Sequence, residues 1–293
     1  ITVDGGAGND TVLGSAANDV VSGGDGDDQV AGNGGNDSVD GDGGDDIILG
    51  GNGDDALNGG ADADTILGEA GDDAIDGGEG DDLIQSGSER DNVTGTDIIT
   101  TGGGEDTIVA AGLGDSLIDD TGLNAFSGDV WTDFDFTQDN IAVNLPSNLI
   151  NLTNIELGKL TVNVADFTGT NDLATILEQN NNVQDQFNDL GNDKLDIVLL
   201  DVLAGNARTN VSGQAGAAEG LYLIVEGDQT GAPFSRTTSE VVKIETPGLT
   251  VNNADLTLDD IVAFDPSFGQ DVTVDNTDDP VVGLPDGTSI LPQ

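Results

Sequence analysis

Aspartate recurs at every ninth position through the first third of the chain. Each of these aspartates follows a glycine-rich stretch. Carboxylate and carbonyl oxygens, six to eight together, are the ligands that a hard divalent cation requires. The spacing therefore predicts a row of cation sites, to which each repeat contributes one set of oxygens. The ten aspartates of the series are Asp10, Asp19, Asp28, Asp37, Asp46, Asp55, Asp64, Asp73, Asp82 and Asp91.

The repeating unit around each aspartate is G-G-x-G-x-D-x-U-x, in which U is a large aliphatic residue. A glycine stands five places before each aspartate, with Ser86 as the single exception, and an aliphatic residue stands two places after it. Glycine allows backbone conformations that are closed to residues with a Cβ atom, so we expect the first six places to turn back tightly. We expect the remaining x-U-x to form a short strand with one side chain pointing inward.

A strand with a single apolar residue cannot bury itself alone, whereas stacked copies can. The pattern therefore predicts an all-β fold that begins with a parallel β-roll, a solenoid stabilised between neighbouring coils. Two repeats make one coil, so we expect equivalent turns to recur at every second repeat. One edge of the solenoid is then lined by Asp10, Asp28, Asp46, Asp64 and Asp82, and the other by Asp19, Asp37, Asp55, Asp73 and Asp91.

The unit matches the nonapeptide of parallel β-helix repeats that bind calcium. GGDGDDQVA at 23–31 and GGEGDDLIQ at 77–85 fit it at every fixed position. On these residues, about the first 120 positions resemble the RTX (repeats-in-toxin) family. The resemblance implies that calcium ions lie between stacked turns, held by the sixth-place aspartates and by carbonyl oxygens of the first four places.

The resemblance also implies which carbonyl groups hold calcium in this sequence. Five turns on each edge leave four gaps, which predicts about eight Ca²⁺ ions. Three repeats, at 14–22, 59–67 and 86–94, lack the fourth-place glycine, and we expect some of their sites to stay empty. The implied carbonyl ligands are Gly23, Gly24, Asp25, Gly26, Gly32, Asn33, Gly34, Gly35, Gly41, Asp42, Gly43, Gly44, Gly50, Gly51, Asn52, Gly53, Gly59, Gly60, Ala61, Gly68, Ala70, Gly71, Gly77, Gly78, Glu79 and Gly80.

Another interpretation is that these glycines and aspartates are simply turn formers with solvated acids. It explains why aspartate is abundant, but not why aspartate is fixed at one place while its neighbours vary. After Asp91 the next aspartate of the series is Asp97, only six residues on, which we interpret as the loss of three residues from one turn. We expect residues 92–118 to continue the solenoid with poorer calcium occupancy.

The aromatic stretch 128–146 contains the only tryptophan of the chain and resembles a segment that often follows RTX repeats. Terminal repeats need a special cover, so we expect Phe126, Trp131, Phe134 and Phe136 to cap the last coil. The resulting domain organisation is a β-roll over 1–123, an aromatic capping segment over 124–146, a β-rich domain over 147–264 and an extended tail or linker over 265–293.

The β-rich domain has alternating apolar residues and one stretch, 172–190, with helical spacing. Its segment 220–264 resembles the C-terminal module of bacterial RTX surface and secreted proteins. The usual dense aspartates are missing from the acidic loop of this module. The predicted strands are 149–157, 160–165, 195–203, 221–226 and 239–245.

Composition narrows the function. The formal charge is −51, and the first 120 residues hold 30 acids and one base, which excludes a nucleic-acid phosphate partner. Such a charged segment should be disordered without cations and folded with them. Cysteine and histidine are absent, so we expect neither disulfides nor a histidine-based catalytic site. No run of eighteen apolar residues occurs, and we therefore expect no membrane span.

Two functions remain open. The first is a secreted structural protein of the surface-layer, matrix or adhesin type, exported by a type I system, folded by external calcium and self-associating at a bacterial cell surface. The alternative is the calcium-binding and secretion part of a larger RTX enzyme or toxin. The chain opens in mid-repeat at Ile1, and we expect it to be a piece of a longer protein. No catalytic motif is present, so we expect no enzymatic activity in these residues.

Overall fold

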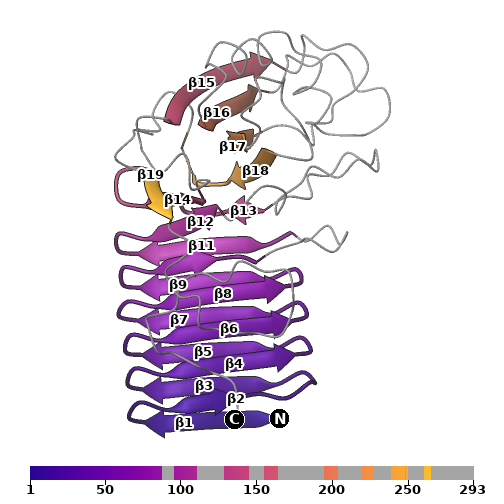
Figure 1. The fold of residues 1–293 in the computed structure, drawn as a ribbon, viewed down its shortest axis with the longest axis vertical. Helices are drawn as coiled ribbons and strands as arrows, with labels where there is room; N and C mark the ends of the chain where they lie inside the picture. The colour runs from indigo at the N-terminus through magenta and orange to yellow at the C-terminus, as the bar shows by residue number, and fades with distance from the viewer. Residues whose placement is uncertain are drawn as a thin grey trace.

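The computed structural model describes residues 1–87, 96–110, 129–144, 155–163, 195–203, 220–226, 239–247, 249 and 261–264. Within these ranges the protein is all-β, with strands in two sheets and no helix (Figure 1). The expected all-β fold with a parallel β-roll is confirmed. The helix expected over 172–190 and the tail over 265–293 lie outside the described residues.

The first ten strands form the two faces of a flat, stacked solenoid (Figure 1). Odd-numbered strands lie in one sheet and even-numbered strands in the other, and neighbours within a sheet run parallel. Val21 pairs with Val39, and Val30 pairs with Ile48, so each coil contains two repeats, as expected. The strands are β1 (Thr2–Ala7), β2 (Thr11–Leu13), β3 (Val20–Asp25), β4 (Gln29–Gly34), β5 (Ser38–Gly43), β6 (Ile47–Asn52), β7 (Ala56–Ala61), β8 (Thr65–Ala70), β9 (Ala74–Glu79) and β10 (Leu83–Gln85).

Most of these strands are longer than the three-residue x-U-x that we expected. In β3, for example, pairing runs from Val20 to Ser22, skips the first-place Gly23, and resumes at Gly24 and Asp25. In the six-residue strands, the second and third places of the turn therefore also join the sheet, whereas β2 and β10 keep the expected three residues. The reason is that a parallel neighbour one coil away offers partners to backbone groups that would otherwise be left unpaired.

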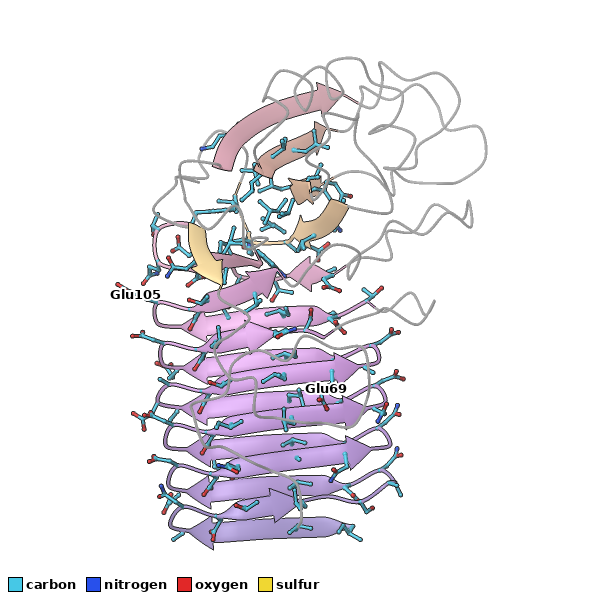
Figure 2. The ribbon with its side chains drawn as sticks, viewed as in Figure 1. Glu69 and Glu105 are labelled. Carbon is cyan, nitrogen blue, oxygen red and sulfur yellow. The ribbon has the colours of Figure 1, made fainter. Side chains whose placement is uncertain are left out.

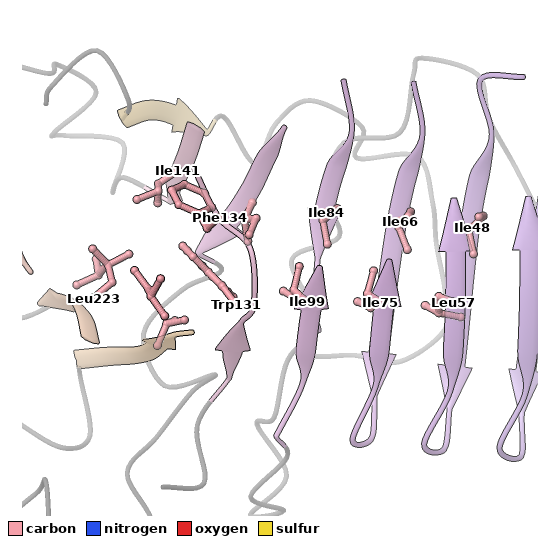
Figure 3. Close-up of a cluster of buried hydrophobic side chains, with 14 of the residues drawn as sticks. Ile48, Leu57, Ile66, Ile75, Ile84, Ile99, Trp131, Phe134, Ile141 and Leu223 are labelled. Carbon is pink, nitrogen blue, oxygen red and sulfur yellow. The ribbon is translucent and has the colours of Figure 1, made fainter. Parts of the chain in front are cut away.

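The solenoid core is one column of aliphatic side chains between the two sheets. Every U residue from Val12 to Ile84 is at most 4 % exposed, and Ile48, Leu57, Ile66 and Ile75 follow one another along the column (Figure 3). Complete burial of such a side chain contributes about 1.5–3 kcal/mol relative to exposure. The expected inward position of the U residue is therefore confirmed.

A second apolar cluster lies on the outer face of the even-numbered strands. Ala31, Leu49 and Leu67 occupy the ninth place of their repeats and are 5–7 % exposed. Side chains at the eighth and ninth places of a strand point to opposite faces, so this cluster is separate from the inner column. The odd-numbered strands carry polar residues at the same place, for example Asp40 and Asn58. The two outer faces of the solenoid therefore differ in polarity.

The break in the repeat series is an insertion, and the deletion of three residues that we expected is wrong. Ala74 pairs with Ile98, and Thr107 pairs with Leu83, so partners across this coil are six positions further apart than in the coils before it. Its strands are β11 (Ile98–Gly103) and β12 (Thr107–Ala110). Asp97 holds the stacked position predicted for Asp91, which lies outside the described residues. In the sequence, Asp91 fits the nine-residue spacing, so the six-residue step from Asp91 to Asp97 looks like a repeat that has lost three residues.

The aromatic segment contributes a further coil, and both of its strands pair onward. Trp131 of β13 (Val130–Trp131) stacks on Ile99, and Ile141 of β14 (Asn140–Asn144) stacks on Ile108. Strand β13 then pairs with β18 (Ser239–Ile244), and β14 pairs with β19 (Ile261–Phe264), so the sheets continue beyond the segment that we expected to cap them. Trp131, Phe134 and Ile141 continue the buried column beyond Ile84 and Ile99 (Figure 3).

The remaining strands extend the eleven-stranded sheet in the order β13, β18, β17, β16, β15. Strands β16 (Leu195–Leu203) and β17 (Gly220–Glu226) lie where predicted. The two strands predicted at 149–157 and 160–165 are instead one strand, β15 (Ile155–Asn163). It stays continuous because all nine of its residues pair in parallel with β16.

Candidate calcium sites

The sixth-place aspartates form two ladders, one along each edge of the solenoid. Each aspartate donates its backbone N–H to Oδ1 of the equivalent aspartate one coil further, as Asp28 does to Asp46 at 2.7 Å. One ladder runs through Asp10, Asp28, Asp46, Asp64, Asp82, Asp106 and Asp139. The other runs through Asp19, Asp37, Asp55, Asp73, Asp97 and Asp129.

The second carboxylate oxygen of these aspartates points into the turn. Although the aspartates from Asp19 to Asp82 are at most 4 % exposed, Oδ2 has no hydrogen-bond donor in most of them. A buried charged oxygen without a partner is costly, so this atom calls for a cation or a proton. The unpartnered oxygens are those of Asp28, Asp37, Asp46, Asp55, Asp64, Asp82 and Asp106.

The first-place glycine of each repeat leaves room beside this oxygen. A Cβ atom at Gly32 would lie 2.5 Å from Oδ2 of Asp37 and 2.6 Å from the carbonyl oxygen of Gly50 in the next coil. We call each such convergence of Oδ2 with a first-place carbonyl a carboxylate–carbonyl site. There are eight among the described residues, beside Gly14, Gly23, Gly32, Gly41, Gly50, Gly59, Gly68 and Gly77, the last two receiving the carbonyls of Ser86 and Thr101.

Glycines at the second and fourth places have a different task. Gly24 has φ of 113° and Gly26 has φ of 126°, a region that residues with a Cβ atom rarely adopt. Our expectation that first-place glycine also serves backbone conformation is wrong, because no first-place residue in the described turns has positive φ. A side chain is excluded there because its Cβ atom would collide with the carboxylate and with the carbonyl oxygen of the next coil.

A family model for the RTX calcium-binding nonapeptide repeat, in four copies, matches the chain repeatedly. The matched ranges are 4–39, 22–57, 31–66, 49–84, 58–93 and 93–117. The solenoid belongs to the RTX calcium-binding family. RTX repeats bind Ca²⁺, and proteins that carry them are typically secreted. The comparison with curated proteins gives no match. None of the described segments contains a helix with the length and apolarity that a bilayer crossing requires.

The RTX turn places its predicted carbonyl ligands in unequal positions. First-place carbonyls (Gly23, Gly32, Gly41, Gly50, Gly59, Gly68 and Gly77) lie toward the aspartate side chain of the preceding coil. Second- and fourth-place residues (Gly24, Asn33, Asp42, Gly51, Gly60 and Gly78; Gly26, Gly35, Gly44, Gly53, Gly71 and Gly80) carry the positive φ values of the turn. At the third place, the carbonyls of Asp25, Gly43, Asn52, Ala61 and Ala70 already accept a hydrogen bond from the fourth-place N–H of the preceding coil. Gly34 and Glu79 hold this third place in their own turns.

A cation in these RTX turns would depend on backbone oxygens. No three acidic side chains of the described residues gather at one point as a metal-binding group. A carboxylate oxygen from one coil and carbonyls from the next fit the oxygen preference of Ca²⁺, whose flexible coordination accepts mixed ligands. The donor set contains no nitrogen or sulfur, which disfavours zinc and copper.

Burial also perturbs the acidity of the ladder. It raises the pKa of Asp46 to about 7, of Asp55 to about 6 and of Asp64 to about 8, because desolvation penalises the charged carboxylate. Neighbouring carboxylates in the ladder act in the same direction. At the solenoid end, the pKa of Asp19 is lowered because the amino group of Ile1 donates a hydrogen bond to it. A bound cation would favour the charged form throughout the ladder.

The RTX edges contain a further ladder that our reasoning from sequence missed. The fifth-place side chain accepts a hydrogen bond from the fifth-place N–H of the next coil, as Asp27 does from Asp45 at 3.3 Å and Asp45 from Ala63 at 3.1 Å. It runs opposite in direction to the sixth-place ladder. Red oxygen atoms therefore mark the turns along both edges, up to Glu105 (Figure 2). The signal was visible, because eight of the ten fifth places hold Asn or Asp.

Proposed function

We propose that this chain is a secreted extracellular structural protein of the surface-layer, matrix or adhesin type, which calcium folds after type I export. The observation that carries the proposal is a row of buried Oδ2 atoms, each beside a first-place carbonyl and without a protein donor, in Asp28, Asp37, Asp46, Asp55, Asp64 and Asp82. Such oxygens are compatible with a charged carboxylate only when a cation is bound. In a cytosol with little free calcium the carboxylates of the ladder therefore repel one another, and the solenoid folds outside the cell.

The proposed number of ions is about eight, one for each carboxylate–carbonyl site. External calcium sites commonly have Kd values of roughly 10⁻⁴–10⁻³ M. At a calcium concentration about tenfold above Kd, each ion stabilises the folded state by about 1.4 kcal/mol. Eight ions then contribute about 11 kcal/mol, which is comparable to the entire stability of a typical domain.

The way the acidic residues are used supports the proposal of a structural rather than a catalytic role. The fifth- and sixth-place acids of the solenoid serve repeated hydrogen-bond ladders, and no repeat in the described part of the solenoid differs in a way that would mark a reaction centre. The charge of −51 keeps copies apart until cations offset it. We therefore propose that calcium both folds the chain and allows its self-association, with no enzymatic activity in these residues.

Light scattering during a calcium titration tests this function, with magnesium as the control. Magnesium demands a small octahedral shell and loses its water reluctantly, so it suits these carbonyl-rich turns poorly. We expect large ordered assemblies with calcium and none with magnesium. A folded monomer at millimolar calcium would contradict the structural role and favour the calcium-binding part of a larger RTX enzyme or toxin.

A further inference from the structure

The coil that contains β13 and β14 satisfies its aspartates differently from the coils before it. Asp129 accepts the backbone N–H of Asp97 on Oδ1 and the hydroxyl of Ser86 on Oδ2, the latter at 3.2 Å. In the preceding coils, Oδ2 of the equivalent acids Asp37 and Asp55 has no donor. A serine hydroxyl thus occupies a role that a cation would fill elsewhere on the same edge.

The opposite edge shows the same replacement. Oδ2 of Asp139 accepts the backbone N–H of Asp135 at 2.8 Å and lies 3.3 Å from the hydroxyl of Thr101. Oδ1 of Asp139 accepts the N–H of Asp106 at 3.3 Å. The change falls between Asp106, whose Oδ2 is still unpartnered, and Asp139.

Ser86 and Thr101 are residues that break the glycine rule. Both stand at the first place of a turn, where the repeats before Ser86 have glycine and a Cβ atom would lie less than 3.0 Å from a carboxylate or carbonyl oxygen. The hydroxyl of each residue faces an acid of the next coil, Asp129 for Ser86 and Asp139 for Thr101. Asp133 also binds this turn, because it accepts the N–H of Thr101 on Oδ1 and the N–H of Gly102 on Oδ2, and its Oδ1 lies 3.1 Å from the Thr101 hydroxyl.

This coil also has a larger apolar core than a calcium-dependent repeat. Trp131 and Phe134 are at most 1 % exposed with ring centroids 5.1 Å apart, and Phe134 contacts Phe136 edge-on at 5.0 Å. Three aromatic rings bury far more area than the single Val or Ile of an earlier strand. The hydroxyl of Thr246 also donates to the carbonyl of Phe134 at 3.0 Å, which links the coil to the residues after β18.

We propose that the coil formed by β13 and β14 is calcium-independent: hydroxyl and backbone donors replace the cation at Asp129 and Asp139, and the aromatic core holds the coil to β18 and β19. The inference rests on the proposed function only in that calcium folds the coils before it. Once the chain is outside the cell, this coil can fold before calcium binds, and the repeats assemble on it when calcium arrives.

The chain carries its own probe for this coil, since Trp131 is the only tryptophan. Fluorescence of the full chain is measured with calcium and with excess chelator, together with far-UV circular dichroism. We expect chelation to remove most of the β signal while Trp131 keeps its short-wavelength emission and resists quenching by acrylamide. Emission that moves to the wavelength of an exposed indole at the same calcium concentration as the loss of β signal would overturn the proposal.

The two measurements separate this proposal from the proposed function. If neither the β signal nor Trp131 emission changes on chelation, calcium-dependent folding fails while the calcium-independent coil stands. If both change together, calcium-dependent folding stands and the calcium-independent coil fails.

A pair of variants tests the hydroxyl donors directly. Thr101→Val removes the hydroxyl that faces Asp133 and Asp139, while Thr100→Val removes one that faces only Thr132 at 3.0 Å. In chelator, we expect the urea midpoint reported by Trp131 to fall in Thr101→Val and to fall less in Thr100→Val. Equal shifts in the two variants would contradict the role of the Thr101 hydroxyl.

Discussion

A single methyl group at Gly32 should abolish one calcium site. The added Cβ would lie 2.5 Å from Oδ2 of Asp37 and 2.6 Å from the carbonyl oxygen of Gly50, which is the space assigned to the ion. Gly32 does not have positive φ, so the substitution strains no backbone dihedral. Its effect therefore reports on the site itself.

The structure offers a matched control two residues away in the same turn. A Cβ at Gly34 would meet only the Cα of Ala16 at 3.7 Å, an ordinary contact, and Gly34 also lacks positive φ. Both substitutions reduce the entropy of the unfolded chain by the same amount, which stabilises by about 0.4–1 kcal/mol. This shared contribution cancels when the two variants are compared.

The expected difference in stability between Gly32→Ala and Gly34→Ala has two contributions. Overpacking beside Asp37 costs about 1–3 kcal/mol, and the loss of one ion costs about 1.4 kcal/mol at calcium tenfold above Kd. We expect Gly32→Ala to be less stable than Gly34→Ala by about 2–4 kcal/mol in calcium. Equilibrium dialysis should find one ion fewer, and urea unfolding should give the stability difference. Equal calcium stoichiometry in the two variants would refute the assignment of the ion to this space.

Three further outcomes are expected. In chelator, lowering the pH from about 8 toward 5 should increase the β signal in circular dichroism. The raised pKa values of Asp46 and Asp64 mean that the folded calcium-free form binds more protons than the unfolded chain. A β signal that falls would contradict this. Ile66→Ala should lower the free energy of unfolding in calcium by about 2–5 kcal/mol, measured by urea titration, because Ile66 is fully buried; a change below about 1 kcal/mol would contradict its place in the core. Raising calcium inside the exporting cell should slow secretion, measured as protein released per cell, because folded repeats cannot thread an exporter; unchanged release would contradict the switch.

The repeat period predicted the solenoid because the spacings of the aspartates, the glycines and the aliphatic U residues all indicated the same stacked coils. A nine-residue step fixes which residues stack, and the inward U residue fixes the face, so the positions of Val21 and Ile48 followed directly. The insertion before Asp97 was misread because a period shows only the spacing between aligned residues. Whether residues were added or lost depends on which aspartates stack in space.

The spacing of the residues could not predict the direction of the hydrogen bonds in the two ladders. The sixth-place Asp28 accepts from the preceding coil, whereas the fifth-place Asp27 accepts from the following one. A pattern of residue types is the same for either direction. The hydroxyl donors Ser86 and Thr101 were missed for a similar reason: in sequence they are exceptions to glycine, and only the stacking with Asp129 and Asp139 gives them partners.

The most direct test of the central claim is far-UV circular dichroism of the metal-free chain during a calcium titration. The carboxylate–carbonyl sites predict that the spectrum changes from largely disordered to β as calcium enters the range of roughly 10⁻⁴–10⁻³ M, and that chelator reverses the change. Magnesium at the same concentrations should leave the spectrum largely disordered. A full β spectrum after metal-free dialysis, unaltered by added calcium, would contradict calcium-dependent folding of the solenoid.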